Sequence, residues 1–204
     1  MLGLPSATEV KKIIPKRALY SKFQLNTAEQ KELDAAIRQL TIVNEISLRT
    51  IPALQKKAED KAIFVLAVQL KQEGCAERIL YKLSRLIDQR LLLALCYADK
   101  VQLSLLFDNK ILLNEFKPAA EQRVTLQGTS LNDIWEHLAL LVANLTPSAG
   151  LTPASVISKA GRRAEIEAQI AALTKKMFAE KQARKKLTLR EAINKLKNEL
   201  EDLS

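Results

Sequence analysis

A chain of 204 residues can bury a substantial core, and a soft rule of about 150 residues per domain favours one globular domain with an extension. The composition is 48% hydrophobic and 4% aromatic with 5 glycines, which argues against an all-β fold with many tight turns. The formal net charge is +9, of which residues 1–26 contribute +4, residues 27–154 contribute 0 and residues 155–204 contribute +5. Either the two basic ends meet a polyanion or an acidic partner, or they are simply solvated.

The cysteines and the apolar runs indicate the compartment. Cys75 and Cys96 do not resemble a disulfide framework, and reduced thiols in a cytoplasmic protein account for them. The sequence holds no run of about 18 apolar residues, and its N-terminal stretch lacks the apolar core of a signal peptide. We therefore expect a cytoplasmic protein with neither a membrane span nor a secretion signal.

The N-terminal stretch predicts a short helix over residues 7–14. Ser6 to Glu9 has the spacing of a capping box, and Pro15 would end the helix. Four basic residues of this region are candidates for contacting nucleic acid or an acidic partner, beside aromatic residues whose helical spacing also suits core packing. They are Lys11, Lys12, Lys16 and Arg17.

The middle of the chain predicts an α+β domain. A capping signature at Thr27–Gln30 opens a helix, and its expected apolar face is Leu33, Ala36, Ile37 and Leu40. Strands are predicted at residues 41–47 and 62–70, a helix at 76–87, a three-strand meander at 91–116, a further strand at 122–127 and a helix from about Ser130. Because residues 62–70 are apolar on both faces, they predict a central strand. We expect a mixed, mainly antiparallel sheet with packed helices.

A proline- and glycine-containing stretch near residue 146 indicates a boundary between two parts of the chain. We expect a globular domain over residues 1–145, a linker over 146–160 and a helical, coiled-coil-like arm over 161–204. Two apolar seams with heptad spacing mark the arm, and they are out of register by two residues, with a capping box at Thr188–Glu191 where a break would fit. The seam residues are Ile166, Ile170, Leu173, Met177, Leu189, Ile193, Leu196 and Leu200. A hairpin and a long helix with two partners both fit this pattern.

The sequence contains no constellation typical of a catalytic or zinc site. Its single histidine, His137, has no partner placed by spacing, and the glycines form no phosphate loop. We therefore expect no cofactor. One enzymatic alternative is a metal-dependent nuclease of the restriction-endonuclease-like class, which holds Mg²⁺ with an acid on one strand and acid-x-Lys on the next. Its candidate residues are Glu45, Asp60, Gln69 and Lys71, with a glutamine where a metal-binding carboxylate is required.

Several segments together resemble a known family. They are LGLPSATEVKKIIPKRALYSKF at the N-terminus, TIVNEIS, AIFVLAVQLK and, in the arm, KQARKKLTL. These segments are similar to the bacterial domain-of-unknown-function family 4391, whose members tend to sit beside helicases and DNA methyltransferases of restriction-like, phage-defence clusters. The resemblance implies an accessory role in such a complex, and it implies no reaction.

The resemblance and the charge pattern lead to one functional expectation. We expect a non-catalytic accessory subunit of a bacterial DNA-processing complex that binds a helicase, a DNA methyltransferase or DNA through its arm. In this hypothesis the eight seam residues insert as knobs into partner helices. The basic residues that would meet phosphate or acidic protein are Lys175, Lys176, Lys181, Arg184, Lys185 and Lys186.

Overall fold

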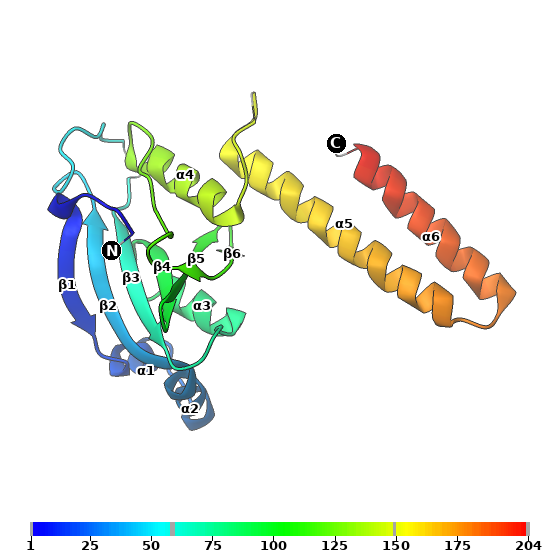
Figure 1. The fold of residues 1–204 in the computed structure, drawn as a ribbon, viewed down its shortest axis with the longest axis horizontal. Coiled ribbons are helices and arrows are strands. Elements are labelled where there is room, and N and C mark those ends of the chain that lie inside the picture. The colour runs from blue at the N-terminus through cyan, green and yellow to red at the C-terminus, as the bar shows by residue number, and fades with distance from the viewer. Residues whose placement is uncertain (1, 58–59, 149, 203–204) are drawn as a thin grey trace. The chain divides into compact units, whose positions relative to one another are not determined.

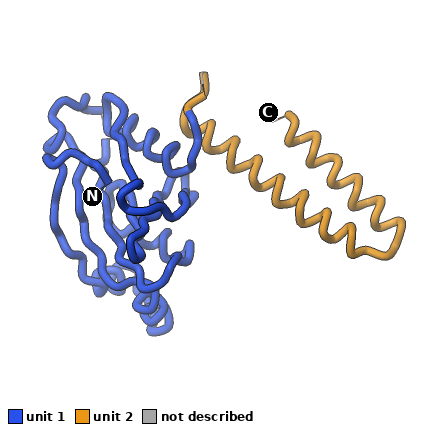
Figure 2. The backbone as a smooth tube through the Cα atoms, viewed as in Figure 1, with its two compact units in different colours: residues 1–146 blue, residues 147–204 orange. Residues whose placement is uncertain are grey.

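A computed structural model describes residues 2–57, 60–148 and 150–202. The chain forms two compact units, residues 1–146 and residues 147–204 (Figure 2). The first unit contains a sheet and the helices packed on it, and the second is a pair of helices (Figure 1). The expected α+β class with a C-terminal helical arm is therefore confirmed. No helix among the described residues combines the length and apolar character needed to cross a membrane.

A seven-stranded sheet organises the first unit. Six strands follow one another in sequence order, each hydrogen-bonded to the next, and β7 (Lys117–Pro118) pairs with β5. Only β3 and β4 are parallel, so the sheet is mixed and mainly antiparallel as predicted. The six strands are β1 (Glu9–Ile14), β2 (Ile37–Ile46), β3 (Ile63–Leu70), β4 (Arg90–Tyr97), β5 (Lys100–Phe107) and β6 (Lys110–Leu113).

The central strand β3 lies between β2 and β4 and is buried on both faces, as its apolar sequence predicted. Because β3 and β4 run parallel, the chain must cross over between them, and α3 (Glu77–Ser84) makes this connection. On the face covered by α3 lie α1 (Arg17–Lys22) and α2 (Thr27–Ala36). Their shared core includes Leu19, Leu33, Ile37, Leu40, Leu66, Leu80, Leu83 and Leu93.

The helix α4 (Leu131–Ala143) packs against β5 and β6 and buries Trp135 and Leu138. The helix predicted from about Ser130 begins with a capping box, in which Ser130 Oγ accepts from the Asp133 backbone N–H at 3.2 Å. Burial opposes ionisation of Asp133, yet hydrogen bonds from Thr129, Lys57 and Ser130 hold the pKa of its carboxyl group below the usual range. The helix is thus fixed at the end that follows the long loop from β7.

The predicted helix over residues 7–14 is wrong. A single 3₁₀ turn spans Ser6–Thr8, and residues 9–14 form the edge strand β1, paired antiparallel with β2. The Thr8 hydroxyl donates to the Pro5 carbonyl at 2.7 Å and accepts from Asn44 Nδ2 at 2.8 Å, which joins this turn to β2, and no side chain caps the turn. A free strand edge on β2 satisfied the backbone of this β-branched segment better than an isolated helical turn.

Two further predictions near the sheet need correction. The cap of α2 is Asn26 rather than Thr27, and the helix ends at Ala36, so Ile37 and Leu40 belong to β2. Both residues are buried, as predicted, but the period of the apolar pattern changes from helix to strand at residue 37. Residues 122–127 form no strand; Val124 N–H donates to the Leu2 carbonyl in a loop.

The second unit is an antiparallel hairpin of α5 (Pro153–Ala179) and α6 (Ala183–Asp202). Thr152 caps α5 by accepting from the Ser155 backbone N–H at 3.2 Å, and Pro153 occupies the first helical turn. Residues 153–160 are therefore helical, although the sequence placed them in the linker. The break between the helices falls at residues 180–182 rather than near Thr188–Glu191, which lies inside α6.

Candidate nucleic-acid interface

The hairpin of α5 and α6 separates charge along its length. We define the hairpin tip as residues 175–190, the end of α5, the turn and the start of α6. The tip holds seven Lys or Arg and one Glu, a formal charge of +6, whereas the rest of residues 147–204 holds five basic and six acidic residues, a formal charge of −1. The whole positive excess of this unit is therefore gathered at its turn.

The heptad seams keep the hairpin closed. Ile166 in α5 and Ile193 in α6 are buried, and the two helices pack along their lengths. The six other seam residues are half-buried, namely Ile170, Leu173, Met177, Leu189, Leu196 and Leu200. The seams thus face one another within the chain. The expectation that all eight insert into partner helices needs correction, because the buried pair is already covered.

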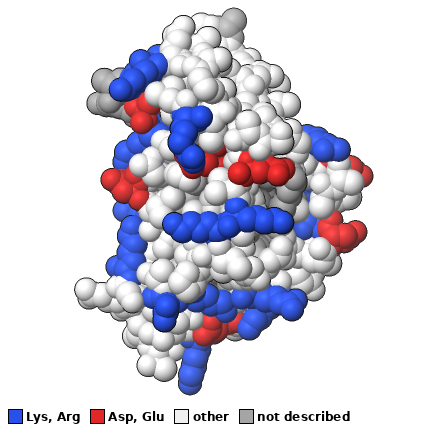
Figure 3. Space-filling view, turned by 90° about the vertical axis from the view of Figure 1, so that its left-hand side faces the viewer, with Lys and Arg blue, Asp and Glu red and all other residues white. Residues whose placement is uncertain are grey.

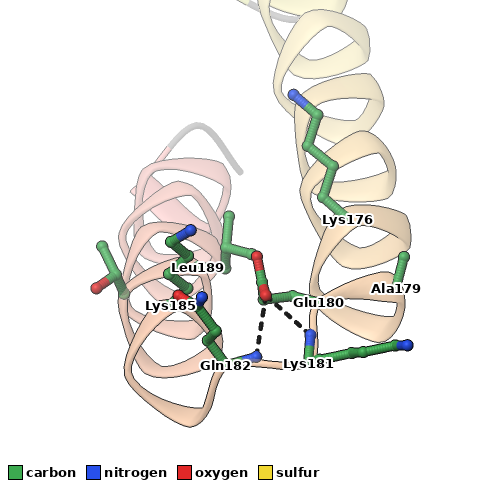
Figure 4. A pocket seen from close by; sticks show the side chains of 8 residues that line it. Lys176, Ala179, Glu180, Lys181, Gln182, Lys185 and Leu189 are labelled. Carbon is green, nitrogen blue, oxygen red and sulfur yellow. Dashed lines mark hydrogen bonds between the residues drawn. The ribbon is translucent and has the colours of Figure 1, made fainter.

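A carboxylate organises the turn. Glu180 Oε1 accepts from the backbone N–H groups of Lys181 at 2.8 Å and Gln182 at 2.9 Å (Figure 4). These donors would otherwise be unsatisfied at the start of α6. The backbone N–H of Gln182 is the largest cause that lowers the pKa of Glu180, and the charges of Lys185 and Lys186 add to it. The one acidic side chain of the tip is therefore bound to backbone donors.

The basic side chains of the tip lack acidic partners. Arg184, Lys185 and Lys186 lie in the first turn of α6, where the positive end of the helix macrodipole disfavours cations. Within the described residues, no ion pair includes any of the seven basic residues of the tip. Away from the tip, Arg162 pairs with Glu199 and Arg163 pairs with Glu167. The tip therefore holds uncompensated charge that an anion would neutralise.

An open hollow of about 710 Å³ lies between the two helices at the tip. Lys176 and Lys185 line it from the two helices, and Lys181 and Glu180 line it from the turn; the Glu180 side chain points toward α6, whereas that of Lys181 extends the other way (Figure 4). Its apolar lining comes from Ala179 and Leu189. Ammonium groups on flexible side chains around an open hollow can neutralise phosphate or carboxylate groups, and none of the lining side chains is a thiol or an imidazole.

The N-terminal basic residues predicted to bind polyanions lie in the first unit. Lys11 and Lys12 are exposed on the edge strand β1, and Arg17 is exposed on α1. Lys16 Nζ instead pairs with Asp34 Oδ1 at 2.8 Å. Figure 3 shows the side of the molecule on which β1 lies, with Lys and Arg side chains spread over it and acidic side chains among them. This face is less uniformly basic than the hairpin tip.

The structure does not bring the nuclease candidates together. In the pairing of β2 with β3, Gln69 lies opposite Gln39, whereas Glu45 lies opposite Phe64. Glu45 and Gln69 are therefore separated by five residues along β3, about 17 Å at roughly 3.3 Å per residue. Two side chains so far apart cannot both be ligands of one Mg²⁺ ion. The spacing of the strands in the sequence could not reveal this, because it does not give their register.

The individual environments of these candidates are also structural. Glu45 accepts from Arg49 Nη2 at 2.6 Å, which is the main cause that lowers its pKa, and from Ser47 Oγ at 2.9 Å. Asp60 Oδ2 accepts from the Lys57 backbone N–H at 2.7 Å. Lys71 donates its backbone N–H to the Ala36 carbonyl at 2.9 Å. The described residues include no group of three or more His, Cys, Asp or Glu side chains that could hold a metal ion, so the residues do not fit Mg²⁺.

Comparison with known proteins identifies a family. The model of the family described as Domain of unknown function (DUF4391) matches residues 2–200. The chain belongs to this family. The match runs through both units, so the hairpin is part of the DUF4391 domain rather than a segment added to it. No curated protein and no solved structure matches the chain.

Two exposed apolar residues at the tip of this DUF4391 chain escaped the sequence analysis. Phe178 and Leu187 lie outside the heptad seams, and their side chains are exposed. The signal was present in the sequence, because Phe178 directly follows the seam residue Met177 and cannot share its helix face. Neither residue belongs to a heptad seam, so heptad spacing alone does not mark them as binding residues.

Proposed function

We propose that this chain is a non-catalytic accessory subunit that binds nucleic acid through the hairpin tip. Its setting is a bacterial cytoplasmic DNA-processing complex with a helicase or a DNA methyltransferase. The observation that carries this proposal is the formal charge of +6 at residues 175–190, against −1 for the rest of the hairpin unit. A dense, unpaired positive charge matches the phosphate backbone, which dominates the affinity of proteins for nucleic acid.

The geometry favours binding over catalysis. The nuclease candidates Glu45 and Gln69 are separated by the register of β2 and β3, and the one carboxylate of the tip, Glu180, accepts hydrogen bonds from two backbone N–H groups of the turn. Burial raises the pKa of both thiols, Cys75 and Cys96, to about 11, which disfavours the nucleophilic thiolate form at neutral pH. The Lys and Arg side chains of the tip therefore act as phosphate ligands in this proposal.

The proposed protein partners, a helicase or a DNA methyltransferase, are supported by observations other than the charge of the tip. The resemblance to a family found beside helicases and DNA methyltransferases motivates those partners, and the two-unit organisation suits an adaptor. In such an adaptor the sheet-containing unit contacts protein while the hairpin contacts nucleic acid. The edge strand β1, with exposed Lys11, Lys12 and Ile13, offers polar and apolar contacts for that purpose.

Binding is tested with two charge-matched variants of the full chain. The tip variant carries Lys181→Gln, Lys185→Gln and Lys186→Gln, and the control carries Lys159→Gln, Lys195→Gln and Lys197→Gln; all six side chains are exposed. Fluorescence anisotropy with a labelled DNA oligonucleotide is measured over a salt series. We expect the tip variant to lose on the order of 10-fold or more in affinity and to reduce the slope of log K against log salt by about 2 to 3.

The control variant separates a local site from general charge attraction. It should bind within about 2-fold of the wild type, since it removes the same charge outside the tip. Equal losses in both variants would contradict a tip site.

Incubation of the wild type with DNA and Mg²⁺ should leave the DNA intact; cleavage that disappears in Lys71→Ala would instead support the nuclease alternative. Co-purification from the native host identifies the protein partner, and recovery of neither a helicase nor a methyltransferase would contradict the proposed setting.

A further inference from the structure

The hairpin tip exposes two apolar side chains that the packing of α5 on α6 does not use. Phe178 is 77% exposed and Leu187 is 58% exposed, while the seam residues beside them are half-buried. Phe178 is the most exposed large hydrophobic residue among those the structure describes. Exposure of an aromatic ring of this size contributes nothing to the stability of the hairpin, so its placement calls for another explanation.

Basic side chains flank both apolar residues on the same helix faces. Lys175 lies three residues before Phe178 in α5, and both side chains are exposed. Arg184 and Arg190 lie three residues before and after Leu187 in α6, and they too are exposed. Residues three apart on a helix are neighbours, so each apolar side chain has a cation about one turn away. This combination of a planar ring and flanking cations suits a base with its phosphates.

The arrangement favours nucleic acid over a lipid surface. A helix that lies on a membrane needs a continuous apolar face. Here the continuous apolar faces of α5 and α6 are the seams, which pack against each other, and the exposed apolar residues of the tip are single side chains among cations. A duplex, in turn, hides the faces of its bases within the stack, where a phenyl ring reaches them only after a base step has been unstacked. Unpaired bases present those faces.

We propose that the hairpin tip binds single-stranded nucleic acid, with the Phe178 ring stacked on an unpaired base and Lys175 and Arg184 contacting the adjoining phosphates. This inference rests on the proposed function and names its ligand class. Leu187 packs against the sugar or a second base at the start of α6. The basic hollow lined by Lys176, Lys181 and Lys185 attracts the backbone without reference to its sequence. Stacking tolerates any base, because every base has a π face.

The test compares three ligands for the full chain. They are a single-stranded oligothymidine, an abasic strand of the same length and a duplex, each titrated by fluorescence anisotropy at one salt concentration. Wild type should prefer the oligothymidine. Phe178→Ala should weaken binding of the oligothymidine by on the order of 10-fold and leave the abasic strand unchanged, whereas Phe178→Trp should retain binding. Leu151→Ala, which removes an exposed leucine outside the tip, is the matched control and should change nothing.

The outcomes separate this inference from the proposed function. Equal binding of oligothymidine and abasic strand, unaffected by Phe178→Ala but abolished in the triple lysine variant of the tip, overturns the stacking inference and leaves the nucleic-acid site standing. Failure of wild type to bind any of the three ligands overturns both. Binding to vesicles of anionic phospholipid that is lost in Phe178→Ala, with oligothymidine unaffected, assigns the ring to a lipid surface and also overturns the inference.

Discussion

The two units of the chain differ in how far their basic residues are paired with acidic ones. In residues 1–146, twenty basic and sixteen acidic residues leave a formal charge of +4, and ion pairs such as Lys16 with Asp34 and Lys82 with Glu29 join separate elements. In the hairpin unit the ion pairs lie away from the turn, and the turn concentrates a charge of +6. Charge in the first unit thus supports the fold, whereas charge at the tip opposes it and is available to a ligand.

The two units also differ in the size of their cores. The first unit buries leucines and isoleucines from strands β2 to β5 and helices α1 to α4, and many of them are completely inaccessible. In the hairpin unit the buried residues are Ile157, Ile166 and Ile193 among those the structure describes. Because its core is small, few positions of the hairpin are constrained by packing. The first unit therefore tolerates little change at its apolar positions, while the hairpin can concentrate binding residues at its turn.

The largest effect is expected in the core of the first unit. Leu66 on β3 is 0% exposed and belongs to the cluster beneath α2 and α3. Leu66→Ala should lower the free energy of unfolding of this unit by about 2–5 kcal/mol, because the substitution removes buried methyl groups and leaves a cavity. Chemical denaturation followed by near-ultraviolet circular dichroism of Trp135 measures it. A loss below about 1 kcal/mol would show that β3 is not the centre of this core.

A smaller and local effect is expected in the hairpin. Ile193 is 6% exposed at the contact between α6 and α5. Ile193→Ala should cost about 2 kcal/mol, near the lower end of the usual range, because two helices can close around the lost volume more readily than a two-sided sheet. Amide hydrogen exchange should rise in both α5 and α6 and stay unchanged in β3. Equal acceleration in β3 would show that the two units unfold as one.

The smallest expected effect is a gain in the stability of the hairpin rather than a loss. Lys185→Gln combined with Lys186→Gln removes two cations from the positive end of the α6 macrodipole. The midpoint of hairpin melting, followed by circular dichroism at low salt, should rise by about 1–3 °C while affinity for DNA falls. The matched pair Lys195→Gln and Lys197→Gln, near the middle of α6, should change neither quantity measurably. A lower midpoint in the tip pair would show that these lysines stabilise the turn.

Element types in strongly patterned segments were predictable from the sequence. The apolar run of β3, the amphipathic α3, the β4–β6 meander and the helix α4 each follow from local periodicity within a few residues. The predicted helix extends past the true end of α2 because Ile37 and Leu40 fit the apolar face of a helix as well as that of a strand. The N-terminal segment was misassigned because a capping-box spacing at Ser6–Glu9 carries less weight than the free edge of β2.

By itself, the sequence determined the class of fold, the presence of a helical arm, the two apolar seams and the excess of basic residues at the ends, because these depend on composition and local spacing. Only the tertiary structure decided that the seams face each other, that the turn falls at residues 180–182, within the basic segment, and that Phe178 is exposed there. It also separated Glu45 from Gln69. Each of these depends on strand register or on where a chain reverses, and both are set by long-range packing that no local pattern encodes.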